Sequence, residues 1–137
     1  MNEPKIVKVD RGGSVRAGTR VSSTLFGDET SSDFLVAWKR LPEGTPPGVY
    51  HLHKKAENVL VVLQGTLECI IGGKRYMARE NEIIYMPAGI PHATGNGGKG
   101  ECHAVEFYAP SRGEGTPNDF FEADLPETIE DTESVRV

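Results

Sequence analysis

Three of the four histidines in this chain have a spacing that suits a metal ion. His51 and His53 are two residues apart, and His92 ends the stretch Pro87-Ala88-Gly89-Ile90-Pro91-His92. Residues i and i+2 of a β-strand project from the same face, so His51 and His53 can aim both imidazoles at one point. Neutral imidazole is the commonest protein ligand for first-row divalent ions, and a histidine from another strand would complete the site. A bare His-x-His is more often a pair of solvated or hydrogen-bonded side chains, so the surrounding sequence must decide.

The surrounding sequence resembles the two motifs of the cupin family. The first reads His-x-His, three or four residues, Glu, six residues, Gly, and is matched from His51 to Gly65. The second reads Gly, five residues, Pro-x-Gly-x-x-His, three residues, Asn, and is matched from Asn81 to Asn96. In this second motif only the leading glycine departs, replaced by Asn81, a residue that also tolerates a left-handed turn. The resemblance covers roughly residues 34–110.

This resemblance implies a cupin jelly-roll β-barrel, or double-stranded β-helix, with one divalent first-row ion in its mouth. The sequence does not distinguish Fe, Zn, Ni, Mn and Cu. The residues independently predict an all-β fold, because β-branched and apolar runs alternate with glycine, proline and asparagine, and no window has a helical period. The predicted strands are 34–41, 59–63, 66–71, 74–77, 82–86 and 103–108, with Gly72-Gly73 as a two-residue hairpin turn.

At 137 residues the chain is long enough for one domain with a buried core. We expect an N-terminal arm with edge strands over 1–33, the barrel over 34–110, and an acidic C-terminal tail over 111–137. Residues 113–137 hold eight acidic side chains against the single Arg136. Phe120-Phe121 is the aromatic anchor expected to dock this tail onto the barrel, and the chain from Glu127 onward is expected to be frayed or disordered.

Composition also limits the compartment and the partners. No basic cluster interleaves with aromatic residues, which argues against a nucleic-acid partner. No apolar run follows Met1 and none approaches the length of a membrane span, so we expect a cytoplasmic protein with no membrane partner. Cys69 and Cys102 lack Cys-x-x-Cys spacing and lie in strand-like segments, which predicts buried, reduced thiols. Small cupins commonly pair, so the resemblance implies a homodimer, with the residues before Phe34 or with Phe120-Phe121 at its interface.

The fourth metal ligand is the position where the chain departs from its family. Gapless spacing from His53 or from Gly65 puts the glutamate of the motif on Asn58, so the site would hold three histidines and one neutral amide oxygen. Glu57 fits only the shorter spacing, and only if a β-bulge turns it inward. An amide oxygen is a weaker ligand than a carboxylate, and the loss of that charge lowers the affinity for hard ions such as Mn²⁺.

Two classes of function remain open from the sequence. One is a metal-dependent enzyme of the dioxygenase, isomerase or lyase type, acting on a small organic acid or on a hydroxylated or aromatic molecule chelated to the metal. The other is a non-catalytic module that binds or senses a small molecule in the same cup. His103 is the candidate catalytic acid or base, provided that its face of the strand points inward; a hydrogen-bonded core or rim histidine is the alternative. Lys54, Lys55 and Arg40 are the candidates for positive charge at the rim, or else simply solvated side chains.

Overall fold

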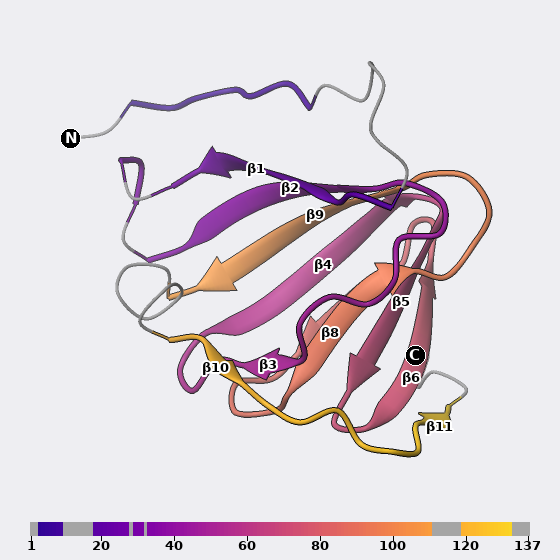
Figure 1. Cartoon of the computed structure of the whole chain (residues 1–137). Coiled ribbons are helices and arrows are strands. Elements are labelled where there is room, and N and C mark those ends of the chain that lie inside the picture. Colours follow the sequence, from indigo (N-terminus) through magenta and orange to yellow (C-terminus); the bar gives the residue numbers. More distant parts are fainter. Residues whose placement is uncertain (1–2, 10–17, 28, 32, 111–118, 133–137) are drawn as a thin grey trace.

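The computed structural model describes residues 3–9, 18–27, 29–31, 33–110 and 119–132. These residues form strands and turns, and none of them forms a helix. The described ranges therefore contain no helix that could span a membrane. The strands build two sheets that face each other, and both barrel sheets are antiparallel apart from one short edge pairing (Figure 1). The predicted all-β double-stranded β-helix is confirmed.

The first sheet has five strands in the order β1-β2-β9-β4-β7. Its long central strands carry the β-branched and aromatic residues that favour extended backbone. Their bounds are β1 Val21–Phe26, β2 Leu35–Leu41, β4 Glu57–Gln64, β7 Ile83–Met86 and β9 Cys102–Ala109.

The second sheet has six strands in the order β10-β3-β8-β5-β6-β11. β3 is short but lies between β10 and β8, so the strand that begins with His51 is paired on both sides. The bounds are β3 His51–Leu52, β5 Thr66–Ile71, β6 Lys74–Arg79, β8 His92–Asn96, β10 Phe121–Glu122 and β11 Glu130–Asp131.

The main core fills the space between the two sheets at one end of the barrel. Alternate residues of each strand point to the same face, so the core members identify the inward positions of β4 and β9. The cluster consists of Leu41, Leu60, Val62, Leu67, Cys69, Ala78, Met86, Cys102 and Ala104. The same parity continues along both strands, so Asn58 in β4 and Glu106 and Tyr108 in β9 also face inward, toward the other end of the barrel.

Left-handed backbone sets the turns that the motifs predict. Asn81 has φ 67°, as expected for an asparagine in the place of the motif glycine. Gly72 and Gly73 have φ 57° and 79°, the pair of positive values that a two-residue hairpin requires. Gly65 has φ 76°, and a Cβ there would lie 2.5 Å from the main-chain oxygen of Glu101. No other residue type fits this turn without moving the backbone that leads into β9.

The outer faces of the two sheets differ. Two apolar rows cross the five-stranded sheet in register, Val36–Phe107–Val59–Tyr85 and Trp38–Val105–Val61–Ile83. Of these side chains, Phe107, Tyr85 and Ile83 are exposed. The outer face of the six-stranded sheet carries a second small core of Tyr50, Ile70 and Ala93, against which Ala123 and Ile129 of the C-terminal segment pack. Figure 1 shows this segment running along the outside of the six-stranded sheet.

The acidic tail is therefore more ordered than its composition indicates. The expectation of fraying from Glu127 is wrong for residues 127–132, because Ile129 packs against the sheet and β11 pairs with β6. Arg75 also binds the Asp131 carboxylate at 2.6 Å. Residues 133–137 lie outside the described part of the chain. Composition gives no sign of this order, because the backbone of the tail can pair with a strand whatever side chains the tail carries.

Candidate functional site

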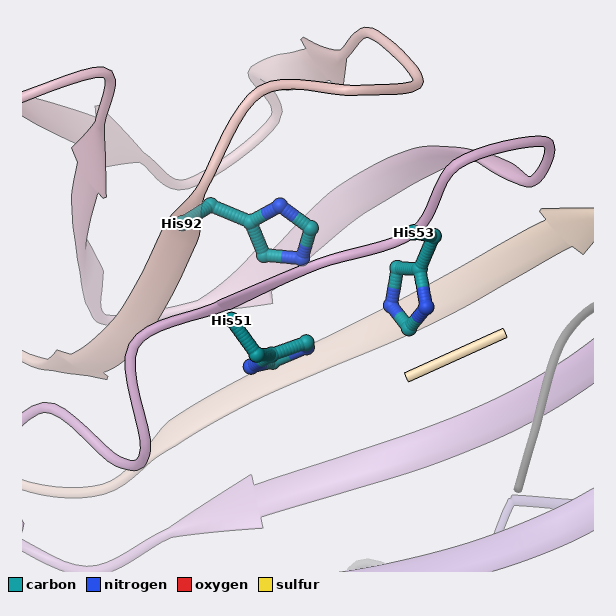
Figure 2. A group of neighbouring side chains, drawn as sticks. All are labelled: His51, His53 and His92. Atoms are coloured by element: carbon teal, nitrogen blue, oxygen red, sulfur yellow. The ribbon is translucent and has the colours of Figure 1, made fainter. Parts of the chain in front are cut away.

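The three histidines of the predicted metal site come together between the sheets. His51 is the cross-strand partner of His92 in the β3–β8 pair, and His53 follows two residues after His51. One ring nitrogen of each histidine lies within 4.8 Å of the other two. Figure 2 shows the three rings turned toward one another, two from the segment that contains β3 and one from the start of β8. These three side chains could hold one metal ion.

The proline-glycine turn before His92 brings the two motifs together. The Gly89 N–H donates a hydrogen bond to the main-chain oxygen of His53 at 2.6 Å, so the turn is tied directly to the first histidine pair. Gly89 has φ 81°, which an L side chain rarely adopts. The spacing of both motifs therefore has a geometric cause: it places three imidazoles at one end of the barrel.

The three rings use the same nitrogen, Nδ1, for their hydrogen bonds to the main chain. The Nδ1 atoms of His51, His53 and His92 lie 2.7, 2.6 and 3.2 Å from the main-chain oxygens of Val49, Asp119 and Ile90. A carbonyl oxygen only accepts, so each Nδ1 carries the proton and each Nε2 keeps its lone pair. Within the described residues, the buried Nε2 of His53 has no hydrogen-bond partner. Buried polar atoms are almost always satisfied, and a divalent ion would satisfy this one.

Burial keeps two of the rings neutral, as metal binding requires. Desolvation lowers the pKa of His92 to about 4, with a further contribution from the neighbouring His51. Desolvation also lowers the pKa of His51, against the opposing effect of its hydrogen bond to Val49. Since a ring with a lowered pKa is unprotonated at neutral pH, protons do not compete for its Nε2 there.

The structure places Asn58 inside the barrel and Glu57 outside. Asn58 is 1% exposed, whereas Glu57 is an exposed residue of β4 whose carboxylate accepts a hydrogen bond from the Tyr85 hydroxyl. The pairing of β4 with β9 is regular from Glu57 to Val62, so no bulge turns Glu57 inward. The Asn58 Nδ2 donates to Glu106 Oε2 at 2.9 Å. Its Oδ1 is buried and has no hydrogen-bond partner in the described part of the chain.

Glu106 is the residue that the sequence reasoning missed. It is 6% exposed and faces inward from β9. Its carboxylate accepts from Asn58, from the Tyr108 hydroxyl at 2.8 Å, and from the Lys39 ammonium at 3.1 Å. Tyr108 in turn lies edge-on to the ring of His53, with centroids 5.6 Å apart. A glutamate within the largely apolar segment 102–109 was the available signal.

The C-terminal segment closes the other side of the histidine cluster. The Asp119 carboxylate accepts from the main-chain N–H groups of Lys54, Lys55 and Ala56 at 2.6, 3.0 and 3.0 Å. The main-chain oxygen of the same residue holds His53 Nδ1. Phe120, the predicted anchor, stacks on His51 with centroids 4.3 Å apart. Residues 119 and 120 thus fix the loop and the rings of the first motif.

The structure does not bring His103 to this cluster. Cys102 and Ala104 belong to the core, so the intervening His103 projects to the opposite face of β9. There its ring stacks on Trp38 with centroids 5.5 Å apart, and its Nε2 lies 3.3 Å from Glu101 Oε1. The condition set for an acid–base role, an inward face, is not met. The histidine is the buried, hydrogen-bonded one of the alternative interpretation.

Positive charge near the cluster comes from a different residue than expected. Arg40 shares the outer face with His103 and pairs with Glu101, and Lys54 lies over the Phe121 ring at 4.1 Å. Lys55 is exposed. Lys39 instead faces inward between Ser22, which it reaches at 2.9 Å, and Glu106, with 24% of its side chain exposed. Its charge is among those that lower the pKa of His51.

The two cysteines have no part in the site. Both are free, buried and members of the main core. Burial raises the pKa of the Cys102 thiol to about 11 and that of Cys69 further. A thiol with a raised pKa is a poor nucleophile and a poor ligand at neutral pH. This agrees with the expectation of buried, reduced thiols.

Comparison with known proteins gives one family and several similar folds. The family model described as "Cupin domain" matches residues 37–108, more than half of the chain. An uncharacterized conserved protein with a double-stranded β-helix domain from Klebsiella pneumoniae is 21% identical, with TM-score 0.72 over 89% of this chain and 99% of its own. The protein TT1209 from Thermus thermophilus is 19% identical, with TM-score 0.63 over 72% and 90%.

A third structure carries a functional description. It is a sugar phosphate isomerase of the cupin superfamily from Silicibacter pomeroyi, 22% identical, with TM-score 0.58 over 66% of this chain and 59% of its own. At these identities the three structures establish the fold alone. No curated protein matches the chain.

Proposed function

Because this chain belongs to the cupin family, we propose that it is a metal-dependent enzyme acting on a small organic acid or a hydroxylated molecule in the mouth of the barrel. The ion would be held by the Nε2 atoms of His51, His53 and His92, with the amide oxygen of Asn58 as a neutral fourth donor. The observation that carries the proposal is that all three Nδ1 atoms are bound to main-chain carbonyls, which leaves each Nε2 without a hydrogen bond from the part of the chain that the structure describes.

A divalent ion in this site would supply Lewis-acid or redox chemistry to an oxygen-bearing substrate. The protein's own contribution is to fix the ring orientations and to restrict water. His53 and His92 are buried, and Phe120 stacks on His51. These contacts hold the rings in place and limit the access of water to them. Histidine rings held by outer hydrogen bonds lose little freedom on binding an ion, which favours affinity.

The preference for an anionic or chelating ligand follows from the charges. The three imidazoles and the amide are neutral, so the donor set does not compensate the charge of the ion. Lys39 adds a positive charge, which Glu106 balances, so the cup with an ion stays positive. A carboxylate or an ionised hydroxyl would meet that charge where solvent screening is weak.

Glu106 and Tyr108 place ionisable side chains inside the barrel, which supports an enzyme over a binding module. The Tyr108 hydroxyl donates to Glu106, and burial together with the Glu106 charge raises the pKa of Tyr108. The tyrosine therefore stays protonated, and because its hydrogen goes to Glu106, its hydroxyl oxygen is left to accept a hydrogen bond from a substrate. Reaction type belongs to the dioxygenase, isomerase or lyase group, and a neighbour described as a sugar phosphate isomerase is compatible with the second of these.

The first experiment measures metal content and affinity. Elemental analysis and calorimetric titration with Zn²⁺ or Co²⁺ should give one ion per chain, lost in His51→Ala and His53→Ala. His103→Ala is the matched control, since His103 is an equally buried histidine on the other face of β9. A wild-type protein that binds no ion after reconstitution, or a His103 variant that loses it as the others do, would refute the metal centre.

The second experiment separates ligand classes. Calorimetry on metal-loaded protein should show carboxylates and catechols binding more tightly than neutral polyols, and the difference should vanish when the metal is stripped. Turnover of a bound compound would establish the enzyme. Tight, metal-dependent binding of substrates without turnover would instead favour the non-catalytic binding module.

A further inference from the structure

Position 58 has no carboxylate in this chain, but the side chain at position 58 contacts one, that of Glu106. Asn58 stands where the family motif has a glutamate, and its amide contacts the buried carboxylate of Glu106 at 2.9 Å. Both side chains face inward from neighbouring strands, β4 and β9. Tyr108, the cross-strand partner of Asn58, completes the link, because it contacts both Glu106 and the ring of His53.

The contacts of Glu106 fix the orientation of the Asn58 amide. A carboxylate accepts hydrogen bonds, so it faces the NH₂ end of the amide and leaves the oxygen pointing elsewhere. All three of its neighbours, Asn58, Tyr108 and Lys39, donate to it. The Asn58 Oδ1 is left buried and without a hydrogen-bond partner among the described residues. This oxygen and the His53 Nε2 are both buried polar atoms without a hydrogen-bond partner in the described ranges, and a cation could satisfy both.

From this geometry, and resting on the proposed metal centre, we propose that Glu106 is a positioning residue. It holds the NH₂ end of the Asn58 amide, so that the amide oxygen is the atom left for the ion. A hydrogen bond from the amide N–H to a carboxylate polarises the amide and makes its oxygen a better donor.

The test exchanges the two functional groups. Glu106→Gln removes the charge and nearly preserves the shape, and should weaken Co²⁺ and Zn²⁺ binding by about tenfold or more. The double variant Asn58→Asp/Glu106→Gln moves the carboxylate to position 58 and the amide to 106, so the charge and the hydrogen bond between them are kept. It should bind both ions at least as tightly as the wild type. Glu101→Gln, on the outer face beside Arg40, is the control and should leave the affinity unchanged.

Each outcome has one meaning. A folded Glu106→Gln variant with an affinity within about twofold of the wild type, less than the effect of a typical supporting residue, overturns the role of Glu106 alone. If that variant does not fold, the exchange variant decides, and an affinity well below the wild type overturns the role. A wild-type protein that binds no ion refutes the proposed metal centre and this role with it. The Co²⁺ absorption spectrum gives a readout independent of activity, because loss of the amide oxygen from the ion changes its intensity and position.

Discussion

Replacing Asp119 by alanine should destabilise the barrel and weaken the metal site together. Its buried carboxylate accepts three main-chain N–H groups of the loop that follows His53. A hydrogen bond to a charged group contributes about 1.5–3 kcal/mol, and most where the donor is shielded from water. Ala56 is buried, whereas Lys54 and Lys55 are exposed and their N–H groups can turn to solvent. One full hydrogen-bond contribution from Ala56 and two reduced ones from Lys54 and Lys55 give a loss of roughly 3–4 kcal/mol in the free energy of unfolding.

Urea denaturation of metal-free protein measures this loss, with Asp124→Ala as control. Asp124 is an exposed carboxylate on the same segment, and its removal should change the free energy of unfolding by less than about 0.5 kcal/mol. Without its carboxylate, residue 119 is held less firmly, and so is its main-chain oxygen, which orients His53. Metal affinity should therefore also fall, by about tenfold. An Asp119→Ala protein as stable as the Asp124 control would refute the reasoning.

The pH dependence gives a second check on the same residue. Burial alone raises the pKa of Asp119, but its three main-chain N–H donors together outweigh burial and lower it. A carboxyl with a lowered folded pKa stabilises the fold above its unfolded pKa, and this stabilisation is lost as pH falls through the folded value. The difference between wild type and variant should therefore be constant from neutral pH to about 4 and shrink below it. A difference that grows on acidification would contradict this assignment.

Three further predictions concern other parts of the chain. Asn58→Ala should weaken metal binding while Glu57→Gln leaves it intact, as measured by calorimetry; the reverse result would mean that the strand is bulged. Gly65→Ala should destabilise the fold by more than about 2 kcal/mol in urea, because a positive φ and a Cβ clash act together; a change near zero would show that the turn adapts. We expect a homodimer by light scattering at micromolar concentration; of the two interfaces expected from the sequence, the residues before Phe34 include β1 at the edge of the five-stranded sheet, and we propose that the apolar outer face of this sheet belongs to the interface. Ile83→Glu, at an exposed position of that face, should give monomers, and a wild-type monomer would reject the dimer.

The sequence predicted the fold and the histidine cluster because both depend on local rules. Period-two alternation and turn residues set the strands, and motif spacing set which ends meet. Asn58 was placed inward by the same spacing. The sequence left open a bulge that would turn Glu57 inward, but the β4–β9 pairing is regular there and has no such bulge.

His103 and Glu106 show where such rules stop. The segment 102–109 is largely apolar on both faces, because one face lines the core and the other belongs to the apolar outer rows. Alternation then shows that His103 and Glu106 face opposite ways, but it does not show which face is inside. Only the packing of Cys102 and Ala104 decides it. Asp119 could not be found either, since its partners are main-chain N–H groups that any sequence would supply.

Asp119, which orients His53 and holds the loop after it, lies late in the chain, and this has a consequence for biosynthesis. Proteins emerge from the ribosome from the N-terminus, so the strands from β2 to β9, with all three histidines, are synthesised before Asp119. A nascent or truncated chain that ends after β9 has every candidate ligand and nearly the whole core, but neither the carbonyl that orients His53 nor the carboxylate that holds its loop. In the proposed metal centre, His53 would be fully oriented for an ion only once the segment that contains Asp119 has been made and has folded back. If the proposed metal centre forms, we therefore expect a fragment that ends after β9 to bind the ion less tightly than a chain that includes Asp119.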